Sequence, residues 1–307
     1  MKINTNISSL TAQEAATNTN RSIAGSLEKL STGLKINKAS DDASGLAIAD
    51  KLRTQVTSIN QGISNGNSAI ALLQITDKSM AEQSKILDTI KSKLIQANTD
   101  TTSTAGRTAI AKDITKLLQQ LNNIGEQTNY NGTTLLQASR TTADASAEGN
   151  LTAARSAKGG LSFQIGEGTA DLITTRTINS NVAGLKLSAL AKAVRSGAKV
   201  SAGATAGTTG VFTRTMAQSG QKAIDKAITT LNGYRGDIGS TQNQVESAVR
   251  NLMTQATNIK NAESVIRDVD YAEESANFNK LNIISQAGSY AISQSNAVSQ
   301  NVLRLLQ

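Results

Sequence analysis

Side chains suited to catalysis or metal binding are scarce in this sequence. Its 307 residues include no His and no Cys, so the usual ligands of zinc, iron and copper are missing. Ser or Cys nucleophiles assisted by His are excluded for the same reason. Only carboxylate or lysine chemistry is left, and we expect no enzyme activity, no catalytic residue, no metal and no cofactor.

The charge of the chain does not by itself indicate a nucleic-acid partner. The formal net charge is +8, which could attract a polyanion. The Lys and Arg residues are scattered, however, and no aromatic residues are interleaved with them for base stacking. We therefore favour a solvated, mildly basic surface and expect no nucleic-acid binding.

The elements that must carry the function are long helices. There is no Pro in the chain, so nothing removes a backbone donor or clashes with the preceding turn. With no Trp, three Phe and four Tyr, the core must be built from aliphatic residues along extended seams. No apolar run is long enough for a membrane span, and the N-terminus does not resemble a secretory signal peptide.

Large aliphatic residues recur at every seventh position in two segments. Rows that stay apolar over six heptads predict supercoiled helices that face one another. A weaker, partly apolar flank follows four residues after each row. The N-terminal row, broken only by Gly66, is Leu52, Ile59, Gly66, Leu73, Met80, Leu87 and Leu94. The C-terminal row is Ile224, Leu231, Ile238, Val245, Leu252, Ile259 and Ile266.

The segments between these rows predict one more helix and a β-hairpin. A third helix carries Ile110, Leu117 and Ile124 and follows a polar turn at 98–106. Residues 161–165 alternate apolar and polar side chains as a half-buried strand does, and 172–178 is its expected partner. We predict a mainly α fold, a long antiparallel helical bundle or coiled coil with a small β-hairpin region.

The two ends of the chain carry sparser apolar rows. An isolated helix of this kind is marginal in water, so we expect these ends to become ordered when several copies bury them together. The N-terminal residues are Ile3, Ile7, Leu10, Ile23, Leu27, Leu30 and Leu34. The C-terminal residues are Ile284, Ala291, Val298, Val302, Leu305 and Leu306.

A long motif lies between the N-terminal end segment and the first row. Residues 30–50 read LSTGLKINKASDDASGLAIAD. Ser40 is the expected N-cap of the following helix, with Asp41 and Asp42 in its first turn, where carboxylates favour the helix dipole. Gly33 and Gly45 bracket the segment and could allow a bend.

This motif resembles the N-terminal hallmark of bacterial flagellins. The opening INTN at 3–6, the turn YNG at 130–132 and the strand FQIG at 163–166 are similar to the same family. So are IRDVDYAEES at 266–275 and NVLRLLQ at 301–307. Together the resemblance covers about residues 1–190 and 215–307 and leaves only a short insertion.

The resemblance implies a structural subunit that polymerises into the flagellar filament for swimming motility. Residues 1–44 and 267–307 would form the inner coiled-coil layer, and 45–190 with 215–266 the helical bundle layer with its hairpin. Residues 191–214 would be a short, exposed variable loop. The implied location is extracellular, reached through type III export without a cleaved signal peptide. The implied partners are other copies, an export chaperone at the C-terminal helix, and cap and hook-associated junction proteins.

One departure from the family concerns three positions on the first long helix. Many flagellins carry an Arg, a Glu and a Leu there, which an innate immune receptor recognises. This sequence has Thr89, Ser92 and Lys93 instead. Because Thr cannot pair bidentately as Arg does and Lys replaces an apolar contact, we hypothesise that the protein escapes that receptor.

Two alternatives stay open on the sequence. A junction protein of the hook–filament boundary shares parts of the terminal design, and another self-assembling coiled-coil protein would explain the heptads but not the terminal motifs. Some flagellins carry a zinc peptidase, but its motif requires His, which this chain lacks.

Overall fold

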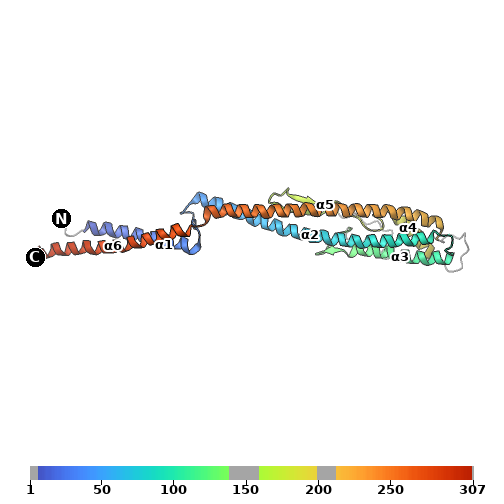
Figure 1. Ribbon diagram of the computed structural model, residues 1–307, viewed down its shortest axis with the longest axis horizontal. Coiled ribbons are helices and arrows are strands. Elements are labelled where there is room, and N and C mark those ends of the chain that lie inside the picture. Colours follow the sequence, from blue (N-terminus) through green and yellow to red (C-terminus); the bar gives the residue numbers. More distant parts are fainter. Residues whose placement is uncertain (1–5, 138–158, 199–211, 306–307) are drawn as a thin grey trace, which may run out of the picture. The chain divides into compact units, whose positions relative to one another are not determined.

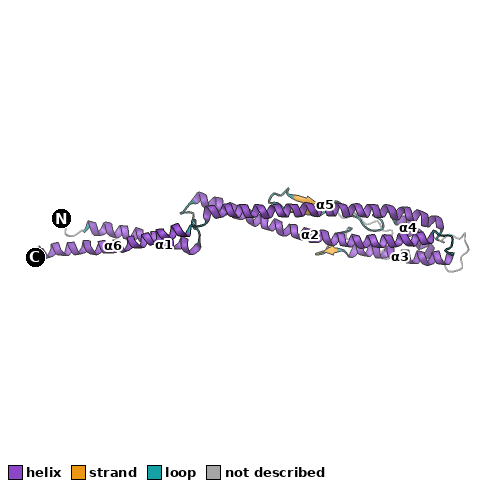
Figure 2. Cartoon of the chain, viewed as in Figure 1, coloured by secondary structure: helices purple, strands orange, loops and turns teal. Residues whose placement is uncertain are grey.

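The computed structural model describes residues 6–137, 159–198 and 212–305, with the backbone alone for 301–305. The chain divides into two compact units. Unit 1 combines residues 1–57 with 254–307, and unit 2 is residues 58–253. Figures 1 and 2 show long helices with a few short strands. The predicted mainly α class with a small β-hairpin region is confirmed.

Six helices account for most of the described chain. They are α1 (Ile7–Thr32), α2 (Ala43–Ala97), α3 (Thr104–Gln127), α4 (Ser188–Ala198), α5 (Arg214–Arg267) and α6 (Tyr271–Leu305). In unit 1, α1 and α6 pack together. In unit 2, α3 packs with α4, and α2, α3 and α5 run alongside one another (Figure 1).

The core face of α2 in unit 2 follows a regular heptad. Its buried positions alternate between steps of three and four, as in a coiled coil. Five members of the predicted aliphatic row are buried: Ile59, Leu73, Met80, Leu87 and Leu94. The other buried row begins three residues later and consists mostly of small or polar residues: Gly62, Ala69, Thr76, Gln83, Ile90 and Ala97. The flank that begins at Val56 is only half-buried.

Two glycines on this face make room for neighbouring elements. A Cβ at Gly66 would lie 2.4 Å from Val249 Cγ2 of α5, so a side chain from α5 fills the break in the predicted row. A Cβ at Gly62 would lie 2.0 Å from the carbonyl oxygen of Ile165. The hairpin backbone therefore rests directly on α2, and Asn65 Nδ2 donates to the Gln164 carbonyl at 3.1 Å beside it.

The predicted rows on α3 and α5 are largely core positions. On α3, Ile110 is buried, whereas Leu117 and Ile124 are half-buried and Leu118 takes the interior position. The α5 members within unit 2 are buried: Ile224, Leu231, Ile238, Val245 and Leu252. In unit 1, Leu52, Ile259 and Ile266 are half-buried.

The strands form two short antiparallel hairpins. The predicted pair appears as β3 (Ser162–Gln164) and β4 (Leu172–Thr174), with Phe163 opposite Ile173. A second pair, β1 (Asn129–Tyr130) and β2 (Thr133–Thr134), was not predicted beyond its turn. Asn131 and Gly132 have φ of 48° and 77°, the left-handed values that a two-residue hairpin turn requires.

The prediction of an exposed loop at 191–214 is wrong for its first residues. Residues 191–198 lie in α4, where Ala191 and Val194 are fully buried. Phe212, just before α5, is also fully buried. Because this segment is rich in small and polar residues, its sequence did not indicate the short amphipathic helix. Residues 199–211 lie outside the described chain.

A buried polar cluster fixes the segment that leads into α4. Gln83 Nε2 donates to the carbonyls of Leu121 at 3.1 Å and Ser180 at 3.2 Å. Asn122 Oδ1 of α3 accepts a bond from the Val182 backbone at 2.9 Å. Because buried polar groups are costly without partners, these bonds hold residues 180–182 on α2 and α3. The start of α4 is thereby positioned.

Candidate assembly surface

The helix α1 is capped by side chains and backbone that its sequence supplies. Asn6 is the N-cap, and its Oδ1 accepts a bond from the Ser9 backbone at 3.2 Å. At the other end Gly33 has φ of 74°, and its N–H donates to the Lys29 carbonyl at 2.9 Å. A left-handed residue at this position is the usual end of a helix, and glycine adopts it without strain.

The segments that follow α1 and α5 pair with each other. Leu34 and Asp268 form an antiparallel bridge. The Lys35 N–H donates to the Arg267 carbonyl at 2.6 Å, and the Val269 N–H donates to the Gly33 carbonyl at 3.1 Å. This pairing ends α1 and begins α6 at the same level, which sets the register of the two helices.

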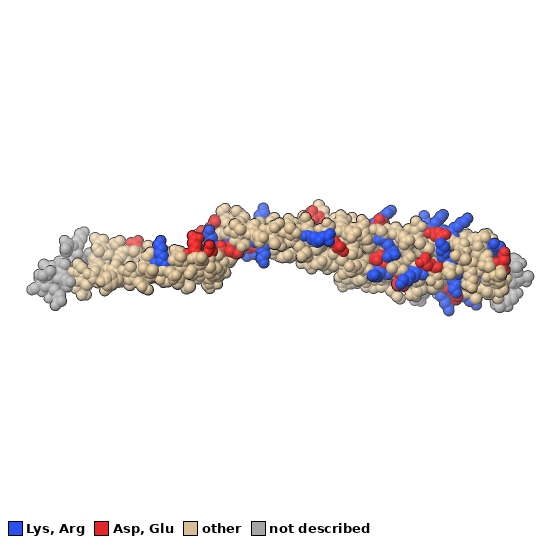
Figure 3. Space-filling view, viewed as in Figure 1, with Lys and Arg blue, Asp and Glu red and all other residues tan. Residues whose placement is uncertain are grey.

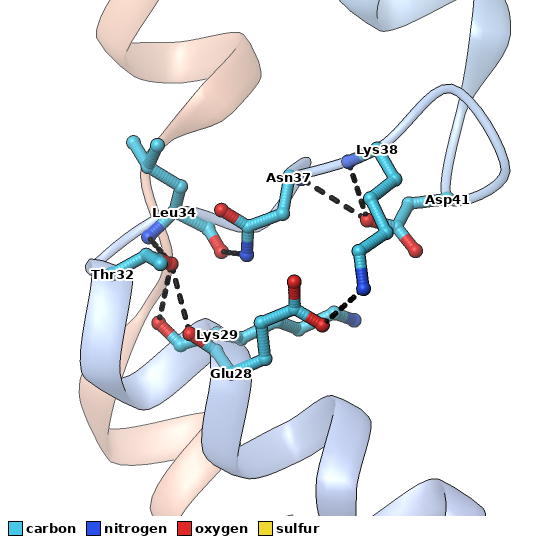
Figure 4. Close-up of polar contacts among 7 residues, drawn as sticks. All are labelled: Glu28, Lys29, Thr32, Leu34, Asn37, Lys38 and Asp41. Carbon is cyan, nitrogen blue, oxygen red and sulfur yellow. Dashed lines mark hydrogen bonds and ion pairs between the residues drawn. The ribbon is translucent and has the colours of Figure 1, made fainter.

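The turn between α1 and α2 is closed by Asp41 (Figure 4). Its Oδ2 accepts bonds from the backbone of Asn37 and Lys38, both at 3.0 Å. Hydrogen bonds from these two N–H groups lower the pKa of the Asp41 carboxyl, and the bond from Lys38 has the larger effect. Lys38 Nζ lies 2.7 Å from Glu28 Oε2, and this hydrogen bond raises the pKa of Lys38.

The predicted N-cap of α2 was wrong by two residues. Asp42, not Ser40, accepts bonds from the backbone of Ser44 at 3.0 Å and Gly45 at 2.9 Å. The neighbouring Asp41 accepts its bonds from the preceding turn, at Asn37 and Lys38. The two carboxylates therefore have different structural roles. Either residue type can cap a helix, and the sequence alone did not decide between them.

The contact between α1 and α6 is a narrow seam of mostly small or polar residues. Its positions alternate between steps of three and four on both helices. The α1 residues are Ser9, Ala12, Ala16, Thr19, Ile23, Ser26 and Leu30. The α6 residues are Glu274, Phe278, Leu281, Ser285, Gly288, Ile292 and Ser295. Only Ser26 of these is fully buried, so the pair buries little apolar area within one copy.

Hydrogen bonds fix the register along this seam. Ser26 Oγ donates to Glu274 Oε1, and Tyr271 Oη donates to the Leu30 carbonyl at 3.0 Å. Further along, Asn6 Nδ2 donates to Ser295 Oγ at 3.2 Å. Bonds of this kind specify an alignment more than they add stability.

Outside the seam, the same two helices carry large apolar side chains that are exposed. On α6, Ile283 is 67% and Tyr290 73% exposed, and they stand seven residues apart. Beside them lies the predicted row of Ile284, Ala291 and Val298, which is also exposed. On α1, Ile7, Leu10 and Leu27 are exposed. We call these side chains the apolar rows.

The surroundings of the apolar rows are nearly free of charge. From Leu281 to Leu303 there is no Asp, Glu, Lys or Arg, and Figure 3 shows few charged side chains over α1 and α6. No described helix has the length and apolarity needed to cross a bilayer. Within the described ranges, no cluster of three or more His, Cys, Asp or Glu residues could hold a metal.

The predicted end residues lie in different surroundings in the structure. Ile23 and Leu30 contribute to the seam within one copy, and Leu34 is half-buried in the linker pairing. Ile7, Leu10, Leu27, Ile284, Ala291 and Val298 belong to the exposed apolar rows. Ile3 and Leu306 lie outside the described residues, and Val302 and Leu305 are described by backbone alone.

The sequence pattern did not single out Ile283 and Tyr290 as assembly residues. They recur at the same step of seven, one position before the predicted row, but the row that begins at Ile284 continues for longer and was chosen instead.

The three positions compared with the immune-receptor site lie on α2 in unit 2. Thr89 and Ser92 are exposed, and Thr89 Oγ1 donates to the Lys85 carbonyl at 2.9 Å on its own helix. Lys93 Nζ lies 3.2 Å from Asp113 Oδ2 of α3. The ammonium of Lys93 is thus drawn toward α3.

A helix pair with a small internal seam and exposed apolar rows is suited to a self-assembling structural protein. Residues 3–141 match the model of the bacterial flagellin N-terminal helical region, and 221–306 match that of the bacterial flagellin C-terminal helical region. The chain belongs to the bacterial flagellin family.

Several relatives align with the whole length of the chain. It is 32% identical over 323 residues to flagellin of Bacillus subtilis, with all of both chains covered. It is 31% identical over 311 residues to the flagellar filament 31.3 kDa core protein of Treponema maltophilum, again over all of both chains. Flagellin A of Helicobacter pylori is 28% identical over 506 residues, with 99% of each covered.

A solved structure from Vibrio parahaemolyticus, named as a flagellar hook-associated protein, shares the fold. It aligns with a TM-score of 0.55 at 12% identity, over 74% of this chain and 99% of that one. At this identity the likeness concerns the fold alone, and it does not favour the junction-protein alternative.

Proposed function

We propose that this chain is the structural subunit that polymerises into the flagellar filament, and that the apolar rows of α1 and α6 are where copies associate. The observation that carries the proposal is that large apolar side chains are exposed on a helix pair with few charges, including a stretch from Leu281 to Leu303 with no Asp, Glu, Lys or Arg. Burying one Leu or Ile side chain is worth about 1.5–3 kcal/mol. Several per copy, repeated along a polymer, supply a strong driving force.

The two units suit different tasks in such a polymer. We assign unit 1 to the inner layer, where neighbouring copies would complete its burial, and unit 2 to the bundle layer, whose core is filled within one copy. The proposed layer boundary lies near residues 44 and 267, whereas the compact units divide at 57 and 254. The first turns of α2 and the last turns of α5 then belong to the connection.

The proposal extends to location and partners. A filament subunit must reach the outside of the cell, and we assign export to the flagellar type III route without a cleaved signal peptide. An export chaperone at the C-terminal helix would cover the rows of α6 before export. Cap and hook-associated junction proteins would meet the same surface at the filament ends. A structural role without enzyme activity accords with the family and with the absence of His and Cys.

Deletion of residues 296–307 tests the proposed function. This change removes Val298 and the end of α6 but leaves unit 2 untouched. The truncated protein should stay soluble and helical by circular dichroism and form no filaments in negative-stain micrographs, whereas the full chain forms long, uniform ones. Normal filament growth from the truncated chain would refute the role assigned to the ends.

The immune-receptor hypothesis has its own test. With Thr89, Ser92 and Lys93 at the three positions, the protein lacks a bidentate cation and an apolar contact, the types of residue that dominate interface energies. A cell reporter for the flagellin receptor should respond at least tenfold less to this protein than to a flagellin with Arg, Glu and Leu there. The triple variant Thr89→Arg, Ser92→Glu, Lys93→Leu should recover part of the response, and equal potency of wild type and variant would contradict the hypothesis.

A further inference from the structure

Two acidic residues that face α2, Asp113 of α3 and Asp225 of α5, form ion pairs with that helix. Lys93 of α2 lies 3.2 Å from Asp113 of α3, and Lys91 of α2 lies 2.7 Å from Asp225 of α5. In both pairs the lysine comes from α2, so the carboxylates of α3 and α5 turn toward that helix.

Four basic residues on α3 and α4 have no such partner in the described chain. Lys112 and Lys116 are exposed one turn apart on α3, about 6 Å along the axis. Lys192 is exposed and Arg195 half-exposed on α4, a helix whose own sequence contains no Asp or Glu. No ion pair joins any of the four to a described carboxylate. We call these four residues the basic patch.

Packing places the basic patch on the outer side of the two helices. The α3 residues that face the core are Ile110, Ala111, Ile114, Leu118, Leu121 and Gly125. On α4, Leu190, Ala191 and Val194 are buried. The four basic residues therefore lie outside the buried positions of two helices that pack together. Figure 3 shows more Lys and Arg over unit 2, intermixed with Asp and Glu, than over α1 and α6.

We propose that the basic patch binds a linear anionic polysaccharide through its sulfate or carboxylate groups. Several unpaired cations in one region raise the local concentration of a polyanion and release its counterions on binding. Neither α3 nor α4 contains an aromatic residue, so nucleic-acid bases would find nothing on which to stack. Three of the four cations are Lys, which acts as a point charge and does not select the fork geometry that Arg recognises.

The test uses the full chain, kept unpolymerised and checked by size-exclusion chromatography, with fluorescein-labelled dextran sulfate as the probe. The patch variant carries Lys112→Gln, Lys116→Gln, Lys192→Gln and Arg195→Gln. We expect its affinity to fall at least tenfold at about 50 mM salt, and the slope of log K against log salt to decrease by about 3, near 0.7–0.9 for each lost contact.

A control variant removes the same charge from scattered positions: Lys51→Gln, Lys78→Gln, Lys260→Gln and Lys280→Gln. All four lysines are exposed, so a loss of affinity below threefold is expected, and neutral dextran should not bind. Equal losses in the two variants, or no loss in the patch variant, would overturn the proposal. Single-stranded DNA of matched charge binding as tightly as dextran sulfate would overturn the choice of polysaccharide. Because the subunit is unpolymerised, the result does not depend on the proposed filament function.

Discussion

Replacing Ile283 and Tyr290 together by Glu is expected to abolish filament growth while the subunit remains folded. Both side chains are exposed in the isolated chain, so two carboxylates cost the subunit little there. In a polymer they would be buried against another copy, and an unpaired buried charge costs several kcal/mol. Since each 1.4 kcal/mol is a factor of ten, the critical concentration should rise at least a hundredfold, measured by sedimentation and electron microscopy.

Two matched variants test whether polymerisation is inhibited by the loss of the apolar rows or by added charge alone. Ser289→Glu with Asn296→Glu places two carboxylates seven residues apart on exposed positions of the same helix, about 100° or more around its axis from Ile283 and Tyr290. This pair should inhibit polymerisation less. The conservative pair Ile283→Val with Tyr290→Phe should polymerise nearly as wild type. Filaments of normal length from the Ile283→Glu, Tyr290→Glu variant, or equal inhibition by both charged pairs, would remove the rows from the assembly surface.

Replacing Gly62 by Ala should destabilise unit 2, although Ala is the better helix former. At an open helical position this change stabilises by about 0.5–1 kcal/mol. At Gly62 the new Cβ would lie 2.0 Å from the Ile165 carbonyl oxygen, so the hairpin must move off α2. Forced overpacking of this kind costs about 1–3 kcal/mol, and urea unfolding of the unpolymerised subunit should show a lowered midpoint.

The same substitution at Gly236 is the control. This glycine lies within α5, and no atom lies within 4 Å of the position its Cβ would take. Gly236→Ala should therefore leave the urea midpoint unchanged or raise it. Opposite signs at the two sites would support close contact between the hairpin and α2. A stabilising effect at both would indicate that β3 does not rest on Gly62.

The large aliphatic row of α2 could be predicted because its members are conspicuous at a fixed period. Its companion row could not, because Gly62, Thr76 and Gln83 carry no hydrophobic signal. Their burial depends on partners distant in sequence. Gln83 can be buried because its side chain donates hydrogen bonds to the carbonyls of residues 121 and 180. No local pattern in α2 predicts these partners.

At the candidate assembly surface, the sequence pattern located apolar residues at both ends of the chain but did not assign them to faces of the helices. The face of α6 that meets α1 is defined by Ser285, Gly288 and Ser295 more than by its aliphatic residues. Small residues permit close approach of two helices without raising the hydrophobicity of the seam. The exposed rows are more apolar than the face of α6 that packs on α1. Hydrophobicity alone would therefore select the wrong face of α6 as the one that contacts α1.

The opposed faces of α6 separate two kinds of information. Residues that meet α1 determine how one chain pairs its own ends, through small side chains and hydrogen bonds such as Asn6 to Ser295. The rows at Ile283 and Ile284 play no part in that pairing. Two chains could thus have the same subunit structure and still fail to copolymerise if only the side chains of their apolar rows differed. Compatibility between strains or between two subunits in one cell would then be decided by a handful of side chains that the fold itself does not constrain.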